Sequence, residues 1–354
     1  MHIHLISGFL GSGKTTAIKT ACKVLQSANK KVGVITNDQG IKLVDAGYFE
    51  SNSIPNRQVI NGCFCCNYNS LDENIQSLIE TNNPEVIFAE SVGSCTDIIA
   101  TVMKPLRQFQ RDVEVTISTF ADVRLLNMLF VENKPLFKDE INYIYKKQLE
   151  EASIIVVSKI DLASKEIVDA VQQFLQTTYP GKQIIFIDGT NDESVLQWLS
   201  IIQKANIQNS LSSLNIDYDI YGAGEAMLAW LDAELRIYSS NNSAKKIAIK
   251  FTQDIYKNIQ EENLSIGHLK FLLDDNMKIS YTSTSEKIID TQFEDASSAL
   301  LLINARIQTN PEFLIELIDK AIQKIEIEND CKILKESYTA FKPGFPNPVY
   351  RIVE

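Results

Sequence analysis

The residues best suited to chemistry begin with a glycine-rich stretch near the start of the chain, Gly8-Phe9-Leu10-Gly11-Ser12-Gly13-Lys14-Thr15. This is a complete Walker A motif, in which backbone N–H groups turn toward a polyphosphate, Lys14 reaches the β- and γ-phosphates, and Thr15 offers a hydroxyl to Mg²⁺. The apolar run 3–6 before it is typical of a strand and residues 16–21 after it of a helix, whose N-terminus favours a bound anion. A glycine-rich turn without phosphate is the plainer alternative. The agreement of motif and context predicts binding of a nucleoside triphosphate.

Three cysteines within four positions form a second candidate site, Asn61-Gly62-Cys63-Phe64-Cys65-Cys66. Thiolates at this spacing can converge on one soft metal ion, and Gly62 allows a tight backbone turn. Three cysteines leave a tetrahedral site one ligand short, which Asp38, Asp45 or a water could complete. Incomplete coordination suits metal transfer better than structural zinc. Buried free cysteines and a redox pair are the alternatives.

Two shorter motifs each follow a predicted strand. In Glu90-Ser91-Val92-Gly93 the carboxylate can hold the Mg²⁺ shell or position the attacking water, and the Gly93 N–H can sense the γ-phosphate. Ser158-Lys159-Ile160-Asp161 matches the guanine-reading Asn-Lys-x-Asp pattern with serine in the first place. Asp161 can accept both guanine N1–H and N2–H₂ while the Lys159 stem packs on the base. A surface salt bridge explains the second motif equally well when it is taken alone.

The apolar runs indicate which elements position these motifs. Strand and helix patterns alternate up to about residue 205, and the expected strands are 3–6, 31–36, 85–89, 113–120, 153–157 and 183–187. Short apolar strands separated by helices predict an α/β P-loop NTPase domain, with a mostly parallel sheet covered on both faces. Ligands of such sheets bind at the carboxyl ends of the strands, where all the motifs fall.

A polar stretch at 208–213 predicts a linker between two domains, 1–207 and 215–354. Beyond it the pattern of predicted elements changes and indicates a smaller α+β domain with the element order βαβββα. The expected elements are a strand at 228–238, a helix at 244–261, a hairpin of 268–273 with 277–281, a strand at 300–308 and a helix at 311–324.

The composition of the 354 residues, 45% hydrophobic and 22% charged, is that of an ordinary soluble globular protein. A net charge of −11 argues against nucleic acid and anionic membranes as partners. No apolar stretch approaches the roughly 18 residues of a membrane span. The first strand begins so early that no room for a signal peptide is expected. Together with clustered cysteines, these features predict a cytoplasmic protein.

The four motifs in this order resemble those of the CobW-like GTPases, relatives of the nickel-insertion GTPases of urease and hydrogenase. Residues 37–40, Asn-Asp-Gln-Gly, fall where that family has its first switch segment. The second half resembles the family's C-terminal domain more loosely, through its βαβββα rhythm and the closing residues 341–346. Two departures stand out. Ser158 replaces the usual asparagine, and the histidine-rich tract of many members is missing, since His2, His4 and His268 are the chain's only histidines.

The resemblance implies a GTPase that uses Mg²⁺, binds Zn²⁺, Co²⁺ or Ni²⁺, and delivers the metal to a client protein. The implied catalytic residues are Lys14, Asp38 and Glu90. The implied nucleotide contacts are Gly8, Gly11, Ser12, Gly13, Lys14, Thr15, Thr16, Gly93, Ser158, Lys159 and Asp161. The implied Mg²⁺ ligands are Thr15 and Glu90, the latter directly or through water, and the transition-metal ligands are Cys63, Cys65 and Cys66.

Two other functions remain open at this point. One is a GTP switch with a structural zinc that gates a cofactor-dependent client such as a corrinoid enzyme. The other is an ATPase or small-molecule kinase. The sequence offers no assignable arginine finger, so slow intrinsic hydrolysis is expected, and relatives suggest a homodimer around the nucleotide as one way to complete the site.

Overall fold

The computed structural model describes residues 1–37, 44, 49, 54–60, 62–109, 113–204, 212–275, 277–285 and 296–353. The chain divides into two compact units, of which the first comprises Met1–Gln39, Asn52–Gly224 and Phe345–Glu354, and the second Gly40–Ser51 and Glu225–Gly344. Asp38 and Asp45, both expected at the sites, lie outside the described residues. The two-domain boundary at 207 and 215 stays a prediction.

The first unit is built on a seven-stranded sheet in the order β3-β2-β4-β1-β5-β6-β7, with every pair parallel. The strands are β1 His2–Gly8, β2 Val32–Asn37, β3 Asn56–Val59, β4 Val86–Glu90, β5 Glu114–Asp122, β6 Ile154–Ser158 and β7 Gln183–Ile187. Every residue of β2, β4 and β6 is buried, as the continuous apolar runs require of a sheet covered on both sides. The predicted α/β fold class is confirmed, although β3, which begins with the polar Asn56, Arg57 and Gln58, was not predicted.

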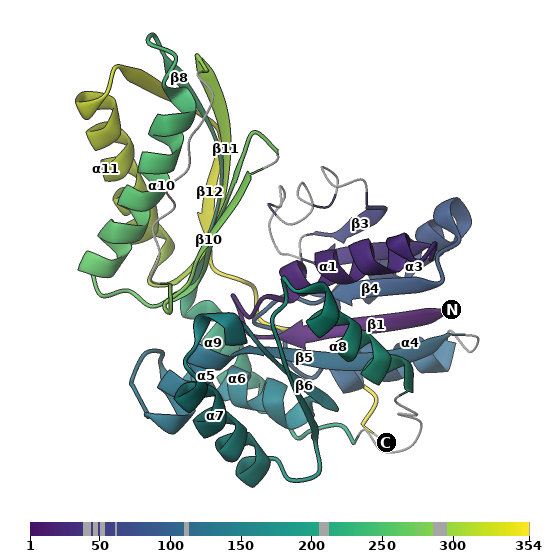
Figure 1. Ribbon diagram of the computed structural model, residues 1–354. Helices are drawn as coiled ribbons and strands as arrows, with labels where there is room; N and C mark the ends of the chain where they lie inside the picture. The colour runs from purple at the N-terminus through teal and green to yellow at the C-terminus, as the bar shows by residue number, and fades with distance from the viewer. Residues whose placement is uncertain are drawn as a thin grey trace. The chain divides into compact units, whose positions relative to one another are not determined.

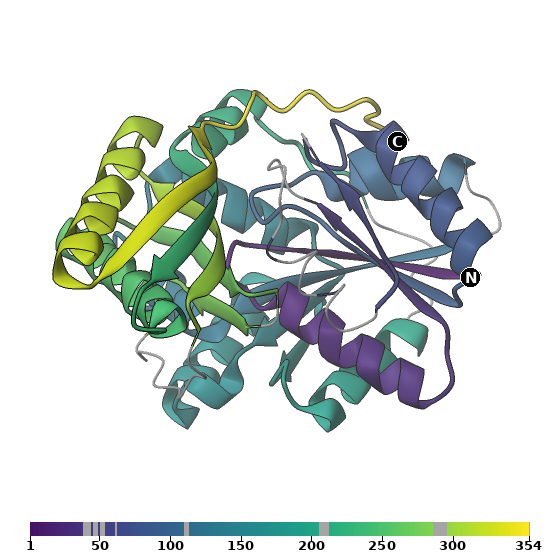
Figure 2. The ribbon, with the colours of Figure 1, turned by 90° about the horizontal axis from the view of Figure 1, so that it is seen from above.

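Helices cover both faces of this sheet, α1 and α8 on one side and α3 and α4 on the other (Figures 1 and 2). The α-helices are α1 Lys14–Ser27, α3 Tyr68–Asn82, α4 Lys104–Phe109, α5 Val123–Leu126, α6 Asp139–Glu151, α7 Lys165–Thr178, α8 Asp192–Lys204 and α9 Tyr218–Ala226. Shorter helical turns span Ile99–Met103, Asn127–Val131 and Ile160–Leu162. Helix α1 buries Ala17, Ile18, Ala21 and Leu25, whose spacing forms one apolar stripe toward the sheet.

The parallel direction of the strands brings the motifs to one edge of the sheet. Ile6 of β1 lies opposite Glu90 of β4, Gly8 opposite Phe120 of β5, and Asp122 opposite Ser158 of β6. Strands β2 and β3 end at the same edge, where Asn37 pairs with Val59. The Walker A loop, both shorter motifs and the loop before the cysteines therefore all leave the sheet at its carboxyl edge, as the strand order requires.

The second unit has a five-stranded antiparallel sheet in the order β10-β9-β11-β8-β12, with α10 and α11 on one face (Figure 1). Its elements are β8 Leu228–Ser239, α10 Ala244–Glu261, β9 Ile266–Leu273, β10 Met277–Tyr281, β11 Ser298–Gln308, α11 Pro311–Glu328 and β12 Cys331–Phe341. The predicted βαβββα order is confirmed, and β12 extends it. This strand was missed because it lies at the sheet edge, where it alternates weakly and carries charged residues.

The other face of this second sheet is polar and largely buried. The Arg306 side chain is fully buried, with its guanidinium 3.8 Å from the Trp230 ring centroid and 3.0 Å from Asp232 Oδ1. Beside it, Asn304 Oδ1 accepts a 2.8 Å hydrogen bond from the backbone N–H of Val44. The Arg306–Asp232 pair and the bond of Asn304 to Val44 thus place polar contacts on the face of the sheet opposite α10 and α11.

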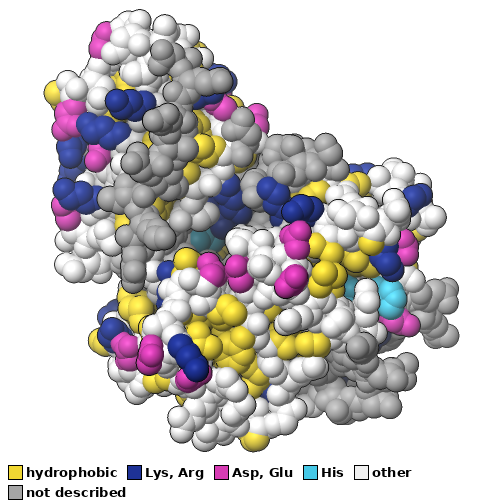
Figure 3. Space-filling view, viewed as in Figure 1, with side chains coloured by type: hydrophobic (Ala, Val, Ile, Leu, Met, Phe, Trp, Pro, Cys, Tyr) yellow, Lys and Arg dark blue, Asp and Glu magenta, His cyan; other side chains and the backbone are white. Residues whose placement is uncertain are grey.

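No helix among the described residues combines the length and apolar character that a membrane span requires. On the face drawn in Figure 3, lysine and arginine side chains are interspersed with aspartate and glutamate.

Candidate functional site

The phosphate loop, residues 8–15, takes a shape that only glycine permits at two positions. Gly8 has φ of 130°, and a Cβ there would lie 2.1 Å from the Phe120 carbonyl oxygen. Gly13, at the N-cap of α1, has φ of 83°. Within the loop the buried Lys14 ammonium donates to the carbonyls of Gly8 at 2.7 Å and Phe9 at 3.2 Å. The predicted phosphate cradle is therefore present, with its lysine directed along the loop.

Thr15 and Glu90 meet beside this loop. The Thr15 hydroxyl donates to Glu90 Oε1 at 3.0 Å, and both side chains are buried. A hydroxyl and a carboxylate oxygen are the hard donors that Mg²⁺ prefers, so this pair fits the ion that the resemblance implies. Thr16 follows in the first turn of α1, where its carbonyl accepts a 3.2 Å bond from Thr20 Oγ1.

The segment after β4 touches the phosphate loop directly. A Cβ on Gly93 would lie 2.8 Å from the backbone nitrogen of Leu10, so any larger residue would push the two segments apart. From the other side, Gln148 of α6 donates to the carbonyls of Gly93 at 3.0 Å and Cys95 at 2.8 Å. Because Gly93 contacts Leu10 directly, a movement of the phosphate loop must also move the segment that contains Gly93.

The base motif also reaches the phosphate loop. Ser158 Oγ donates to the Ser12 carbonyl at 2.6 Å, and Lys159 Nζ donates to the Gly11 carbonyl at 2.5 Å. Lys159 adopts φ of 61°, which turns the chain out of β6. Asp161 follows in the short turn Ile160–Leu162 with its side chain exposed. Ser158 and Lys159 thus bond to the phosphate loop, while the Asp161 side chain is exposed to solvent.

Asp122 at the end of β5 is a site residue that sequence reasoning missed. Its carboxylate lies 3.0 Å from Lys159 Nζ and 2.9 Å from Arg124 Nη2. Burial opposes ionisation of Asp122, but Lys159 and Arg124 outweigh it and hold the pKa of this carboxyl below its usual value. The sequence offered one indication of this role, because Asp122 is an acidic residue just beyond the predicted strand 113–120, at the carboxyl edge of the sheet.

The three cysteines converge as predicted. Cys63 Sγ lies 2.7 Å from Cys65 Sγ and 3.3 Å from Cys66 Sγ, and Cys65 and Cys66 are 3.7 Å apart. All three are free, and these distances exceed the roughly 2.05 Å of a disulfide. Four sulfurs bound tetrahedrally to Zn²⁺ at about 2.3 Å would lie about 3.8 Å apart, so only a small expansion is needed. They are the only group of potential ligands of this kind among the described residues.

The thiols of this cluster have pKa values that are shifted in opposite directions. Hydrogen bonds from Cys65 and Cys66 lower the pKa of Cys63 well below its usual value, and the same interaction raises the pKa of Cys65. A fourth thiol, Cys95, also hydrogen-bonds with Cys63 and Cys65. Cys95 is fully buried and lies two residues after Gly93, on the segment that touches the phosphate loop. The cluster therefore groups thiols that suit a soft cation, and it lies against the segment that contacts the phosphate loop at Gly93.

Two asparagines shape the cysteine loop. Asn37, the last residue of β2, donates to the carbonyls of Val59 at 3.0 Å and Gly62 at 2.7 Å, and accepts from the N–H of Phe64 at 2.8 Å. Asn67 donates its N–H to the Cys63 carbonyl at 2.8 Å. This role of Asn37 was missed, although Asn37 is the first residue of the predicted switch segment 37–40.

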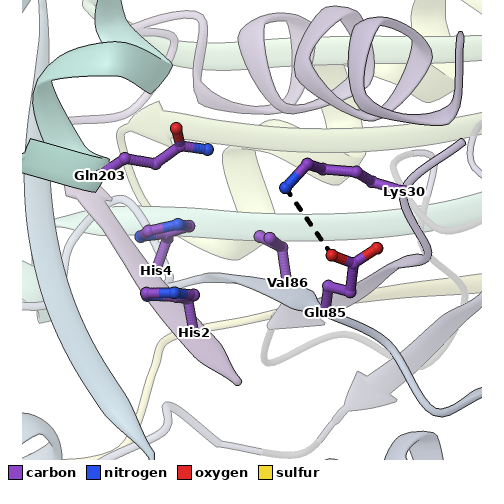
Figure 4. A pocket seen from close by; sticks show the side chains of 6 residues that line it. All are labelled: His2, His4, Lys30, Glu85, Val86 and Gln203. Atoms are coloured by element: carbon purple, nitrogen blue, oxygen red, sulfur yellow. Dashed lines mark ion pairs between the residues drawn. The ribbon is translucent and has the colours of Figure 1, made fainter. Parts of the chain in front are cut away.

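A separate cavity of about 290 Å³ opens at the amino edge of the sheet (Figure 4). It is lined by His2, His4, Lys30, Glu85, Val86 and Gln203. Burial lowers the pKa of His4 to about 3, so this ring is neutral, and its Nδ1 lies 2.5 Å from Thr116 Oγ1. Lys30 pairs with Glu85 at 3.7 Å. The cavity lies at the edge opposite the motifs, and its ionisable groups pair with nearby residues, so the candidate site is the carboxyl edge.

Comparisons with known proteins agree with this geometry. Residues 2–186 match the family model described as CobW/HypB/UreG, nucleotide-binding domain. The chain is 26% identical to the zinc chaperone YeiR of Escherichia coli over 185 residues, 51% of this chain and 53% of that protein. It is 28% identical to the zinc chaperone CobW of a Sinorhizobium species over 247 residues, 62% of this chain and 68% of that protein. The first match thus spans about half of its relative.

Among solved structures, HypB from Helicobacter pylori in complex with nickel is similar, with a TM-score of 0.45 and 15% identity, covering 60% of this chain and 91% of that one. A GTPase in apo form from Pyrococcus abyssi is similar with a TM-score of 0.33 and 13% identity, covering 59% of this chain and 98% of that one.

Proposed function

The chain belongs to the CobW/HypB/UreG family of P-loop GTPases, and from this premise we propose that it hydrolyses GTP to control the loading and delivery of a zinc ion. The observation that carries the proposal is the placement of Cys95 within bonding reach of Cys63 and Cys65, two residues from Gly93. One short segment therefore contacts both the phosphate loop and the cysteine cluster.

At the nucleotide, the protein's contribution is positioning and charge. Lys14 stands where it can neutralise charge on the β- and γ-phosphates, and the loop amides bind the phosphate oxygens. Mg²⁺, held by Thr15 and Glu90, would supply further charge neutralisation between the phosphates. We propose Asp38 and Glu90 as the groups that orient the attacking water, and pairing of two copies around the nucleotide as the completion of the site. Sedimentation with and without a GTP analogue tests that pairing.

Guanine selection is assigned to Asp161. Its carboxylate is exposed after β6 and can accept the two N–H donors of guanine, whereas adenine presents no such pair. Asp161→Asn should lower the affinity for a GTP analogue and leave the weak ATP affinity unchanged. An adenine preference of the wild type would instead favour the ATPase or kinase function.

The metal cargo is bound by Cys63, Cys65 and Cys66. Their soft thiolate donors suit Zn²⁺ and Co²⁺, and the names of the curated relatives favour zinc. A linkage of about 1–3 kcal/mol between nucleotide and metal would change zinc affinity about 5–150-fold, enough to load in one state and release to a client metalloprotein in the other. By reciprocity zinc must change GTP affinity by the same factor.

The proposal is tested by titrating zinc into the protein with a GTP analogue or with GDP. We expect one zinc per chain and different affinities in the two states. The triple variant Cys63→Ser, Cys65→Ser, Cys66→Ser should lose that zinc, whereas Cys331→Ser, a control cysteine in the second unit, should keep it. Equal zinc affinity in both nucleotide states would refute the coupling.

A structural zinc that only stabilises a GTP switch remains the second candidate, because the cysteines lie in a buried loop. It predicts that the triple serine variant unfolds or loses GTP binding, since structural sites contribute folding energy. The transfer function predicts that the variant keeps the unfolding midpoint and the GTP affinity of the zinc-free wild type.

A further inference from the structure

The end of the chain returns to the first unit and lies on the cysteine loop. This C-terminal tail, residues 345–353, places the backbone N–H of Asn347 3.2 Å from Cys66 Sγ. The N–H of Val349 donates to the Cys65 carbonyl at 2.9 Å. Among the three cysteines Cys66 is the half-buried one, so the tail borders the more open side of the cluster.

The tail is anchored beyond the cysteines by a set of independent contacts. Its Tyr350 ring packs 5.1 Å from the Tyr68 ring and 5.2 Å from that of Phe109. Arg351 Nε donates to Asp97 Oδ2 at 2.7 Å, and the Asp97 side chain is 1% exposed. The Ile352 N–H donates to the Ala100 carbonyl at 2.9 Å. An ion pair to a buried carboxylate and backbone bonds of this kind fix the tail in one register.

We infer that the C-terminal tail is part of the metal site, with the Asn347 N–H as a positioning group for the Cys66 thiolate. This inference rests on the proposed function. An N–H donor directed at a ligating sulfur orients the thiolate and stabilises its negative charge, and groups in this position commonly change metal affinity 10- to 100-fold. Asn347 acts through Cys66 and contributes its main chain, so the identity of its side chain is unimportant.

The same tail connects the metal site to two other parts of the chain. Through Arg351 it holds Asp97, which lies four residues after Gly93 on the segment that follows Glu90. Through residues 342–344 it continues directly from β12, a strand of the second unit. A change in either part can therefore be transmitted along the chain to Cys66. Release of the tail would remove one sulfur hydrogen bond and uncover the most accessible ligand.

The test compares Asn347→Pro, which removes the N–H, with Asn347→Ala, which keeps it. Both are made in the full chain and titrated with Zn²⁺ and with Co²⁺. We expect Asn347→Pro to lower metal affinity about 10- to 100-fold and to shift the thiolate-to-cobalt charge-transfer band. Asn347→Ala should match the wild type in both measurements. Equal metal affinities and spectra for the two variants would overturn the inference.

Two further measurements keep the outcomes apart. If Asn347→Pro keeps the unfolding midpoint and the GTP-analogue affinity of the wild type, its effect is confined to the metal site. Should that variant unfold more easily, Arg351→Gln releases the tail from Asp97 without a proline, and zinc affinity equal to the wild type's then overturns the inference. A wild-type protein that binds no zinc at its cysteines refutes the proposed function itself, whereas zinc binding that is insensitive to the tail refutes only this inference.

Discussion

The phosphate loop and the cysteine loop leave the same edge of one sheet but are built in opposite ways. The phosphate loop is continuous in sequence, and although Ser158 and Lys159 also bond to it, glycines and the bonds of Lys14 to carbonyls of its own residues set much of its shape. The cysteine loop depends on distant parts of the chain, namely Asn37, Cys95 and Asn347. A continuous loop owes its geometry largely to neighbouring residues, whereas an assembled loop changes its geometry when any of several distant segments moves.

The largest expected effect comes from breaking the phosphate loop at Gly8. Gly8→Ala places a Cβ 2.1 Å from the Phe120 carbonyl oxygen at a φ of 130°. Overpacking and backbone strain together should cost about 3 kcal/mol or more in unfolding free energy, and GTP binding should be lost. Urea unfolding measures this cost. Gly344→Ala, which meets nothing within 4 Å, is the control and should stay within about 0.5 kcal/mol of the wild type.

How well each loop could be predicted depends on whether it is continuous in sequence or assembled from distant segments. Gly8, Gly13 and Lys14 could be assigned from the sequence because a short loop between a strand and a helix specifies its own geometry. The parallel sheet was likewise predictable, since strands such as Ile154–Ser158 are continuous apolar runs that need burial on both sides.

The second prediction tests how far the phosphate loop depends on the base motif. Lys159→Met keeps the apolar stem but removes the ammonium that bonds to the Gly11 carbonyl and to Asp122. Loss of a charged hydrogen bond costs about 1.5–3 kcal/mol, so affinity for a GTP analogue should fall about 10- to 150-fold in calorimetry. Lys165→Met, an exposed neighbour on α7, is the control. Zinc affinity measured without nucleotide should be unchanged, because Lys159 bonds to Gly11 and Asp122 and not to the cysteine loop, and a matching fall there would contradict this assignment.

The cysteine loop shows where sequence reasoning ends. Cys63, Cys65 and Cys66 were assigned because they are adjacent, but the partners that shape their loop lie far along the chain. Asn347 follows Cys66 by 281 positions, and its contribution is a backbone N–H that every residue except proline possesses. No residue-type signal marks such a group, so only the folded chain reveals it. Asp122 was missed for a related reason, because its partner Lys159 directly follows the neighbouring strand β6 and meets it only in the folded sheet.

The third prediction concerns the pH dependence of stability, and it tests a buried residue that bonds to the segment beside the cysteine loop. Glu151 on α6 is buried and accepts from the Ile99 N–H at 2.5 Å, two residues after the tail anchor Asp97. Burial raises the pKa of Glu151 from 4.5 to about 8, and Asp97 adds to the effect. Between pH 4.5 and about 8, Glu151 is protonated in the folded state and ionised in the unfolded state. Stability should therefore fall as pH rises through that window, by up to about 1.4 kcal/mol per pH unit.

Unfolding midpoints of Glu151→Gln, measured from pH 5 to 8, check this dependence. The amide keeps an acceptor for Ile99 but cannot ionise, so the slope should flatten. Glu150→Gln on the same helix, which removes the 2.6 Å pair with Lys147, should leave the slope as in the wild type. A slope that survives in Glu151→Gln would assign the titration to another group.

The smallest expected effect is at Cys95, and it distinguishes a supporting thiol from a ligand. Cys95→Ala removes the hydrogen bonds to Cys63 and Cys65 but none of the three converging ligands. A single net hydrogen bond contributes about 0.5–1.5 kcal/mol, so zinc affinity should fall between about twofold and tenfold, with Cys95→Ser restoring part of it. Zinc titration with a colorimetric competitor is sensitive enough for this range. A loss far beyond tenfold, unrelieved by serine, would make Cys95 a fourth ligand, so that the segment in contact with the phosphate loop would itself coordinate the metal.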